Sequence, residues 1–150
     1  MTNPRFALGV VVLVLAGSAP VWGQETAAVG RIKVLSGSAF ILRQSATIPA
    51  ELGQVVFETD GLRTGADGRI GVTLKDDTRV SLGPNSEARI DRFVYAPADG
   101  RLGFVFNIVR GVAAYVSGQI AKLAPDSIRL ETPAAIVGVR GTSLAVRVEP

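Results

Sequence analysis

The chain of 150 residues contains no cysteine and no histidine. Without cysteine, no disulfide can form and no lipid can be attached at an amino-terminal cysteine, so packing and backbone pairing must hold the fold together. A zinc site of the usual kind draws on these two residue types, and cysteine nucleophiles and the commonest general base are missing as well. We therefore expect a non-enzymatic protein that carries no cofactor and no metal ion.

A strong excess of charge is also missing. The 16 lysines and arginines outnumber the 13 acidic residues only slightly, which gives a net charge of +3. Domains that bind nucleic acid usually carry a clustered and much larger basic excess. We therefore expect no nucleic acid among the partners.

Long hydrophobic runs are scarce, and the clearest one lies at the amino terminus. This run, at residues 6–16, follows a basic residue and precedes small, turn-forming residues at 18–23. The pattern predicts a signal peptide over residues 1–23, cleaved before Gln24, so that the protein is periplasmic or secreted and has no membrane span after cleavage. The alternative is a retained anchor helix, but the uncharged stretch is marginal in length for a bilayer and contains glycine and proline.

After residue 24 the sequence alternates between apolar and polar residues over short segments. Residues 69–75 and 79–82 alternate in this way on either side of Asp76-Asp77, which predicts a β-hairpin. Aspartate tolerates the positive φ that such a turn requires. We expect one short helix, within residues 117–124.

The apolar residues of each predicted strand should share the buried face of a sheet. These sets are Ile32 with Val34; Phe40 with Leu42; Leu102 with Phe104, Phe106 and Ile108; after a break at Gly111, Val112 with Ala114 and Val116; Ile128 with Leu130; and Leu144 with Val146 and Val148. The spacing predicts an all-β fold with a single domain over residues 24–150. We expect a compact β-solenoid or roll with two facing sheets, and a β-sandwich is the alternative.

The turn residues occur in an order that resembles a FecR-type domain. The sequence Asp-Gly-Leu-Arg-Thr-Gly at 60–65 is followed by the hairpin at 69–82, a Gly-Pro-Asn-Ser turn at 83–86 and a carboxy-terminal half at 117–142. One departure is Asp77, which stands where the family usually has glycine. The family-motif positions, expected to be mainly structural, are Asp60, Thr64, Gly65, Asp76, Asp77, Gly111, Thr132, Pro133, Gly138, Arg140, Gly141 and Thr142.

The FecR regulators that give the family its name have three parts. A cytoplasmic segment binds an alternative sigma factor, one helix crosses the inner membrane, and a periplasmic domain senses a loaded outer-membrane receptor. Because the apolar run begins at Phe6, we expect only the periplasmic module here. The resemblance implies an exported interaction or sensing domain of the cell envelope that binds an unknown envelope protein in signalling. The alternative is a structural envelope module that binds polysaccharide or peptidoglycan.

Arg140 is the candidate partner-binding residue. It lies in an apolar stretch at 132–142 that contains no acidic residue, and a guanidinium cannot lose its charge. In a structural role it would bind backbone carbonyls or a distant carboxylate, with Gly138 and Gly141 allowing close approach of the main chain. In a functional role it would be an exposed fork that grips a carboxylate of a ligand or partner. The candidate carboxylates within the chain are Glu58, Asp60 and Glu131.

Two pairs of acidic residues are candidates for reactive sites. Asp76 and Asp77 should lie solvated at a hairpin tip, and Glu58 with Asp60 could share one strand face and suit a cation. Turn and surface roles are favoured for both pairs, because a perturbed acid needs a buried pocket.

Eight arginines are expected at outward or turn positions, where they could meet acidic partners or envelope polysaccharide. The alternative is a plain solvated face. These residues are Arg69, Arg79, Arg89, Arg92, Arg101, Arg110, Arg129 and Arg147.

Overall fold

The computed structural model describes Gly17, residues 27–139 and residues 141–149. Most of the predicted signal peptide and Arg140 therefore lie outside the described residues. Nearly all regular structure is strand. The strands are β1 (Ala28–Ser36), β2 (Ala39–Arg43), β3 (Ala46–Pro49), β4 (Val55–Phe57), β5 (Gly61–Thr64), β6 (Arg69–Leu74), β7 (Arg79–Leu82), β8 (Glu87–Ala96), β9 (Arg101–Val116), β10 (Ile128–Glu131), β11 (Ile136–Gly138) and β12 (Ser143–Val148). The helical turns are η1 (Pro97–Asp99), α1 (Gln119–Leu123) and η2 (Pro125–Ser127).

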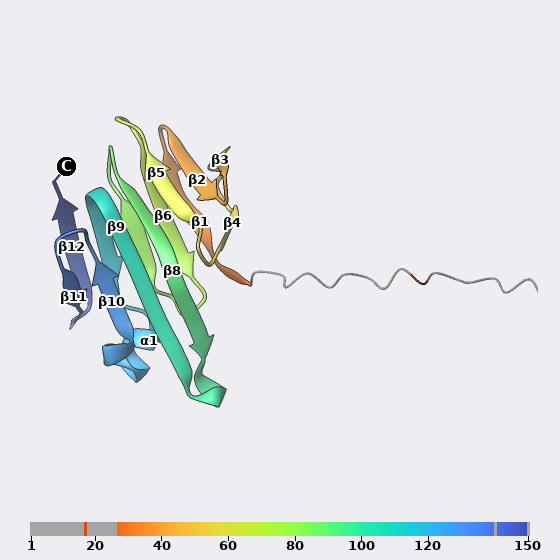
Figure 1. Cartoon of the computed structure of the whole chain (residues 1–150), viewed down its shortest axis with the longest axis vertical. Helices are drawn as coiled ribbons and strands as arrows, with labels where there is room; N and C mark the ends of the chain where they lie inside the picture. The colour runs from red at the N-terminus through yellow and green to blue at the C-terminus, as the bar shows by residue number, and fades with distance from the viewer. Residues whose placement is uncertain (1–16, 18–26, 140, 150) are drawn as a thin grey trace, which may run out of the picture.

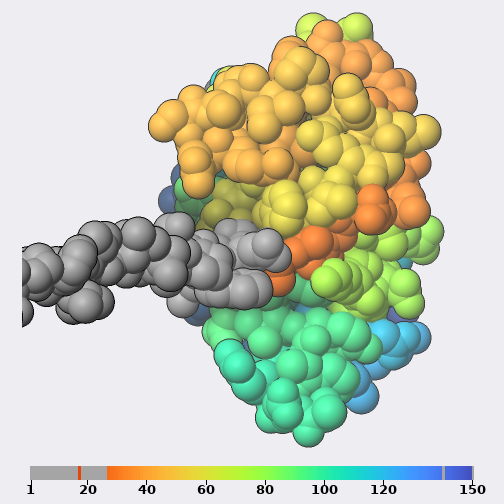
Figure 2. Space-filling view, turned by 90° about the vertical axis from the view of Figure 1, so that its right-hand side faces the viewer, coloured from red at the N-terminus to blue at the C-terminus, as the bar shows by residue number. Residues whose placement is uncertain are grey.

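The strands form one curled, mostly antiparallel sheet, which confirms the all-β prediction (Figure 1). Their order is β3-β2-β5-β8-β9-β7-β6-β1-β4, with β10 and β12 also paired to β9 and β11 paired to β10. The pair β10–β9 is parallel. Seen from the side, the β2–β3 region and the turn between β8 and β9 lie at opposite ends of the molecule (Figure 2). The finer arrangement, two facing sheets in a solenoid or roll, stays a prediction.

Strand β9 joins two parts of this sheet. Its residues 101–110 pair with β8, and residues 104–107 also pair with β10. Its residues 111–116 pair with β12, and residues 113–116 also pair with β7. We call the first part, with β2, β3, β5 and β11, the β8 side, and the second part, with β1, β4 and β6, the β7 side.

The concave face of the sheet holds the core, to which both sides contribute. Ile41 and Leu62 of the β8 side and Val72 and Val80 of the β7 side are all buried in one cluster. Each such side chain stabilises the fold by about 1.5–3 kcal/mol relative to an exposed position. The ring of Phe104 stacks against Phe106 at a centroid distance of 5.9 Å and against Tyr115 at 6.1 Å.

The predicted hairpin is present, with Val72 paired to Val80, and α1 lies within the segment expected to be helical. Phe104, Phe106 and Ile108 share the buried face, as predicted. Among residues 27–139 and 141–149, no helix has the length and apolar character needed to cross a membrane.

The face predicted for residues 112–116 is wrong. Ala113 and Tyr115 are buried in the core, whereas Val112, Ala114 and Val116 are half-buried on the other face. The side-chain period shifts by one residue because Gly111 has a φ of 84° and the pairing with β8 is irregular just before it. A shift of one residue moves every later side chain of a strand to the opposite face.

The two amino-terminal strands also differ from the prediction. Ile32 is buried but Val34 is 59% exposed, because a bulge between them adds one residue to β1 opposite β6. In β2, Ile41 faces the core, so its neighbours Phe40 and Leu42 lie on the half-exposed face. A bulge depends on the partner strand as well as on the local sequence, which explains the first error.

Candidate functional site

Asp60 lies between β4 and β5 and is only 2% exposed. Arg43 of β2 binds it with two hydrogen bonds, Nε to Oδ1 at 3.0 Å and Nη2 to Oδ2 at 2.8 Å. The backbone N–H of Phe57 donates to the same carboxylate at 2.9 Å, and the Arg43 guanidinium lies 4.6 Å from the centre of the Phe57 ring. The hydrogen bond with Asp60 raises the pKa of Arg43. This motif residue therefore closes a turn and joins it to β2.

Glu58 and Asp60 do not form the shared strand face that was considered for a cation. Both lie in the turn between β4 and β5. The Glu58 carboxylate accepts a hydrogen bond from the backbone N–H of Phe93 at 2.9 Å, whereas Asp60 is bound by Arg43. Each carboxylate thus has its own structural partner.

Thr64 at the end of β5 holds the turn between β7 and β8. Its hydroxyl donates to the carbonyl of Gly83 at 2.7 Å and accepts from the backbone N–H of Ser86 at 2.9 Å. Ser86 Oγ in turn accepts from the N–H of Val112 at 2.8 Å. A Cβ atom at Gly111 would lie 2.2 Å from Ser86 Oγ. Both this close approach and the positive φ of Gly111 therefore require glycine at this position. These residues stabilise β9 at Gly111, where its pairing passes from the β8 side to the β7 side.

Gly65 continues this arrangement into the next turn. Its N–H donates to the carbonyl of Ser38 at 2.8 Å, and its carbonyl accepts from the N–H of Asn85 at 3.0 Å. A Cβ atom at Gly65 would lie 3.1 Å from the Cβ of Ser38. The close packing of three turns therefore favours glycine here.

Asp76 is 1% exposed, which overturns the prediction that it is solvated. Its carboxylate accepts from the N–H and the hydroxyl of Thr78 at 3.0 and 2.7 Å, and from the N–H of Ile120 at 3.1 Å. Its backbone carbonyl accepts from the N–H of Gln119 at 2.7 Å. A Cβ atom at Gly118 would lie 2.3 Å from the backbone nitrogen of Thr78. The start of α1 thus packs on the hairpin and covers Asp76.

Asp77 is exposed, as predicted, and has a φ of 67°. Aspartate accepts this left-handed conformation more readily than most residues do. The departure from the usual glycine therefore preserves the turn between β6 and β7.

Thr132 and Pro133 form an exposed turn between β10 and β11. The hydroxyl of Thr132 accepts from the N–H of Ala135 at 3.1 Å, and the N–H of Thr132 donates to the carbonyl of Ala135 at 2.8 Å. Pro133 is exposed. The two motif residues thus close this turn locally.

Gly141 and Thr142 join the last strand to the end of β9. The hydroxyl of Ser117 donates a hydrogen bond to the carbonyl of Gly141 at 2.6 Å. The backbone N–H of Ser117 donates to the carbonyl of Thr142 at 2.8 Å. Gly141 has a φ of 115°, which explains glycine there. A Cβ atom at Gly138 or Gly141 would meet no described atom within 4 Å, so close approach of described residues is not the reason for either glycine.

Arg140 itself lies outside the described residues. Each of the carboxylates considered for it has another partner: Asp60 binds Arg43, Glu58 binds the N–H of Phe93, and Glu131 lies 3.9 Å from Arg129. Its role stays a prediction.

Sequence reasoning missed the partners that bury the motif residues. Arg43, Ser86 and Gly118 each contact a predicted motif position from another segment of the chain, and Thr78 contacts Asp76 within the same hairpin turn. Ser86 was visible as the end of the Gly-Pro-Asn-Ser turn. Nothing in the local sequence pairs Arg43 with a residue 17 positions away.

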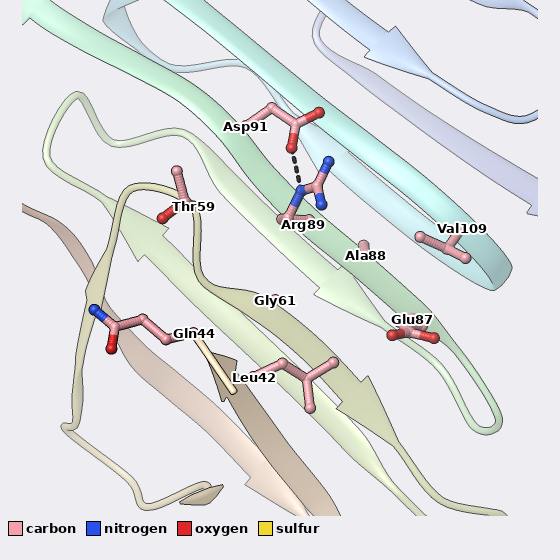
Figure 3. Close-up of a pocket in the computed structure, with 9 residues that line it drawn as sticks. All are labelled: Leu42, Gln44, Thr59, Gly61, Glu87, Ala88, Arg89, Asp91 and Val109. Atoms are coloured by element: carbon pink, nitrogen blue, oxygen red, sulfur yellow. Dashed lines mark hydrogen bonds and ion pairs between the residues drawn. The ribbon is translucent and has the colours of Figure 1, made fainter. Parts of the chain in front are cut away.

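An open depression of about 520 Å³ lies on the convex face of the β8 side (Figure 3). Its lining residues are Leu42, Gln44, Thr59, Gly61, Glu87, Ala88, Arg89, Asp91 and Val109. Arg89 Nε donates to Asp91 Oδ1 across one part of it. Gly61 contributes no side chain, which leaves room between Leu42 and Arg89. No motif position lines this depression.

Two buried side-chain atoms lack a hydrogen-bond partner among the described residues, Nε of Arg63 and the hydroxyl of Tyr115. Tyr115 is 1% exposed. Burial raises the pKa of Tyr115; the side chain of Ser117 acts against this shift, and the negative charge of Asp76 adds to it. The ring packs on Phe104 in the core, so this tyrosine is a packing residue.

Most of the described motif residues therefore lie in or beside turns, and many of them make contacts that hold strands together; Gly111 and Gly138 lie within strands. A family model described as FecR protein matches residues 60–150. Because this match covers more than half of the chain, the chain belongs to the FecR protein family. The family is a regulatory, signalling-related family of the cell envelope and is not known as enzymatic. No similar curated protein and no similar solved structure was found.

Proposed function

We propose that this protein is an exported, non-catalytic interaction or sensing domain that binds a protein partner in envelope signalling. The proposal rests on the family match over residues 60–150. The described motif residues support it indirectly, because they are committed to turns and strand contacts. A partner would then be recognised by the exposed surface of the sheet; for Arg140 we favour a structural role and keep partner binding as the alternative.

Export is the first part of this proposal. Residues 1–23 act as a signal peptide, and residues 24–150 form the mature domain in the periplasm or outside the cell. Amino-terminal sequencing of the protein recovered from its own cells should begin at or near Gln24. Recovery of a chain that begins at Met1 would contradict cleavage and favour the anchor.

Binding of a protein is the second part. A photo-reactive amino acid can replace exposed alanines at distant positions, namely Ala98, Ala134 and Ala145. Irradiation of living cells should give a discrete covalent adduct that contains a second protein from at least one position. Absence of adducts at all three positions would contradict a protein partner. Co-sedimentation of the protein with purified peptidoglycan would then favour the structural module.

Arg140 can be tested against a matched arginine. Arg101 is exposed at the start of β9, so Arg101→Ala serves as the control. If Arg140 is structural, as we infer, Arg140→Ala lowers the melting temperature more than the control does. An unchanged melting temperature together with loss of the adduct would make Arg140 a partner contact instead.

A further inference from the structure

The strands on the convex face of the β7 side carry basic residues and no acidic ones; Glu149, just after β12, lines the same depression as Arg147. The strands β1, β6, β7 and β12 and residues 111–116 of β9 contain neither aspartate nor glutamate. Five of their basic residues are exposed; Arg31 donates to the backbone carbonyl of Gly53 at 3.0 Å, and none of the other four is in an ion pair with a described residue. We call this surface the basic face; its charged residues are Lys33, Arg69, Arg79 and Arg147.

The strand register places small side chains along the middle of the basic face. Val34 pairs with Gly71, Gly71 with Ser81, Ser81 with Ala114, and Ala114 with Ala145. These residues form a continuous cross-strand row from β1 to β12. The surface along this row is therefore low and open.

Larger residues border this row on both sides. Arg79 pairs with Val116 on one side, and Val112 pairs with Arg147 on the other. Arg69 and Arg147 lie on β6 and β12, three strand spacings apart, or about 14 Å. An open depression of about 260 Å³ lies over the β1 end of the row, lined by Lys33, Val34, Gly71, Val72, Thr73, Arg79, Val80, Ser81 and Val116.

We propose that the basic face docks an acidic surface of a partner protein. Guanidinium groups bind carboxylates with two parallel hydrogen bonds, and three of the four basic residues are arginines. The half-buried Val112 and Val116 and the exposed Val34 add apolar side chains among these charges. Protein–protein interfaces commonly combine apolar residues with arginine. The inference rests on the proposed function and names the surface and the chemistry of its partner.

An anionic polysaccharide is the competing ligand, and the residues of the face favour a protein over it. The face contains no aromatic side chain on which a sugar ring could stack, since Tyr115 points into the core. Its valines would stay uncovered under a chain of charged sugars, whereas a folded partner would bury them.

The adduct experiment tests the position of the surface. Ala145 lies on the cross-strand row, and Ala98 lies in the turn between β8 and β9. The photo-reactive residue should give a protein adduct at Ala145 and none at Ala98. An adduct at Ala98 or Ala134 but not at Ala145 would overturn the basic face and leave the proposed function standing. No adduct anywhere overturns both.

A direct binding assay tests the chemistry, with poly-L-glutamate as the acidic polypeptide probe. In low salt the purified full-length protein should bind it, with amide NMR shifts concentrated in β6, β7, β12 and residues 111–116. Arg79→Glu with Arg147→Glu should weaken binding about tenfold. Arg92→Glu with Arg101→Glu changes the net charge equally from exposed sites on β8 and the start of β9, and should weaken binding less than about threefold.

Three results would overturn this proposal. Equal losses for the two double variants would show that only net charge matters. Shifts spread over the β8 side would place binding elsewhere. Tighter binding of polygalacturonate than of poly-L-glutamate at equal charge and salt would favour a polysaccharide. Arg79→Gln with Arg147→Gln removes the charges without reversing them, and serves as the variant pair if charge reversal disturbs folding.

Discussion

The two sides of β9 use their outward arginines differently. On the β8 side, Glu87 lies between Arg63 and Arg110 of the neighbouring strands, at 3.3 and 3.7 Å. On the β7 side, Arg69 and Arg79 have no acidic partner among the described residues. The described ion pairs all lie on the β8 side, although Arg92 and Arg101 there are in none of them. The outer charges of the β7 side form no described ion pair, and we propose them for contacts with a partner.

The largest effect is expected where β9 passes from one side to the other. Gly111→Ala should lower the free energy of unfolding by about 3 kcal/mol, because the residue has a positive φ and its Cβ would meet Ser86. Gly53→Ala is the matched control, since Gly53 has a φ of 83° and open space around it; it should cost about 1–2 kcal/mol. Urea denaturation measures both. Equal losses would show that the contact with Ser86 is unimportant.

The next largest effect is expected at Asp76, which joins the β6–β7 hairpin to the start of α1. Asp76→Asn removes a buried, charged acceptor of three hydrogen bonds, and should cost about 2 kcal/mol. The adjacent Asp77→Asn keeps a residue that tolerates positive φ at an exposed site, and should change stability by less than about 0.5 kcal/mol. Thermal unfolding monitored by circular dichroism compares the two. A larger loss for Asp77→Asn would contradict the role of Asp76.

Ion pairing can be compared directly between the sides. Glu87→Gln on the β8 side should cost about 0.5–1 kcal/mol in low salt and less in high salt, because half-exposed pairs are screened. Arg69→Gln on the β7 side should leave stability unchanged at both salt concentrations. Chemical denaturation at two ionic strengths provides the measurement. A salt-sensitive loss for Arg69→Gln would reveal a charge partner on the β7 side.

The smallest effect at neutral pH is expected for Tyr115→Phe. Its hydroxyl has no described hydrogen-bond partner, so the change should lie within about 0.5 kcal/mol. Because burial raises the pKa of Tyr115, the unfolded chain loses this proton first as the pH rises above about 10. Above about pH 10, the free energy of unfolding of the unmutated protein should therefore fall faster with rising pH than that of Tyr115→Phe. Parallel pH curves for the two proteins would contradict this linkage.

Local sequence was enough to predict several elements. The hairpin at 69–82 and the buried face of Phe104 to Ile108 follow from alternation alone. Val34 and residues 112–116 were assigned to the wrong face because a bulge and the positive φ of Gly111 shift the period. Such shifts depend on how a strand fits its neighbours as well as on its own residues.

The partners of the motif residues also could not be predicted from the local sequence. The order of the turns was sufficient to indicate the FecR family, which the family match confirms. The burial of Asp76 could not be predicted from its hairpin, because the covering residue Ile120 lies 44 positions further along the chain. The partner of Asp60 was likewise hidden in β2.

The position of β9 in the chain has a consequence for the order of assembly. A ribosome releases the chain amino terminus first, and β8 and β7 each have β9 as a sheet neighbour. Until residues 101–116 emerge, the first hundred residues can form hairpins but cannot join them into one sheet. Closure of long-range strand pairs is slow in β proteins. Until then the strands that precede β9 expose their apolar faces, and a chaperone that binds unfolded chains would bind these faces.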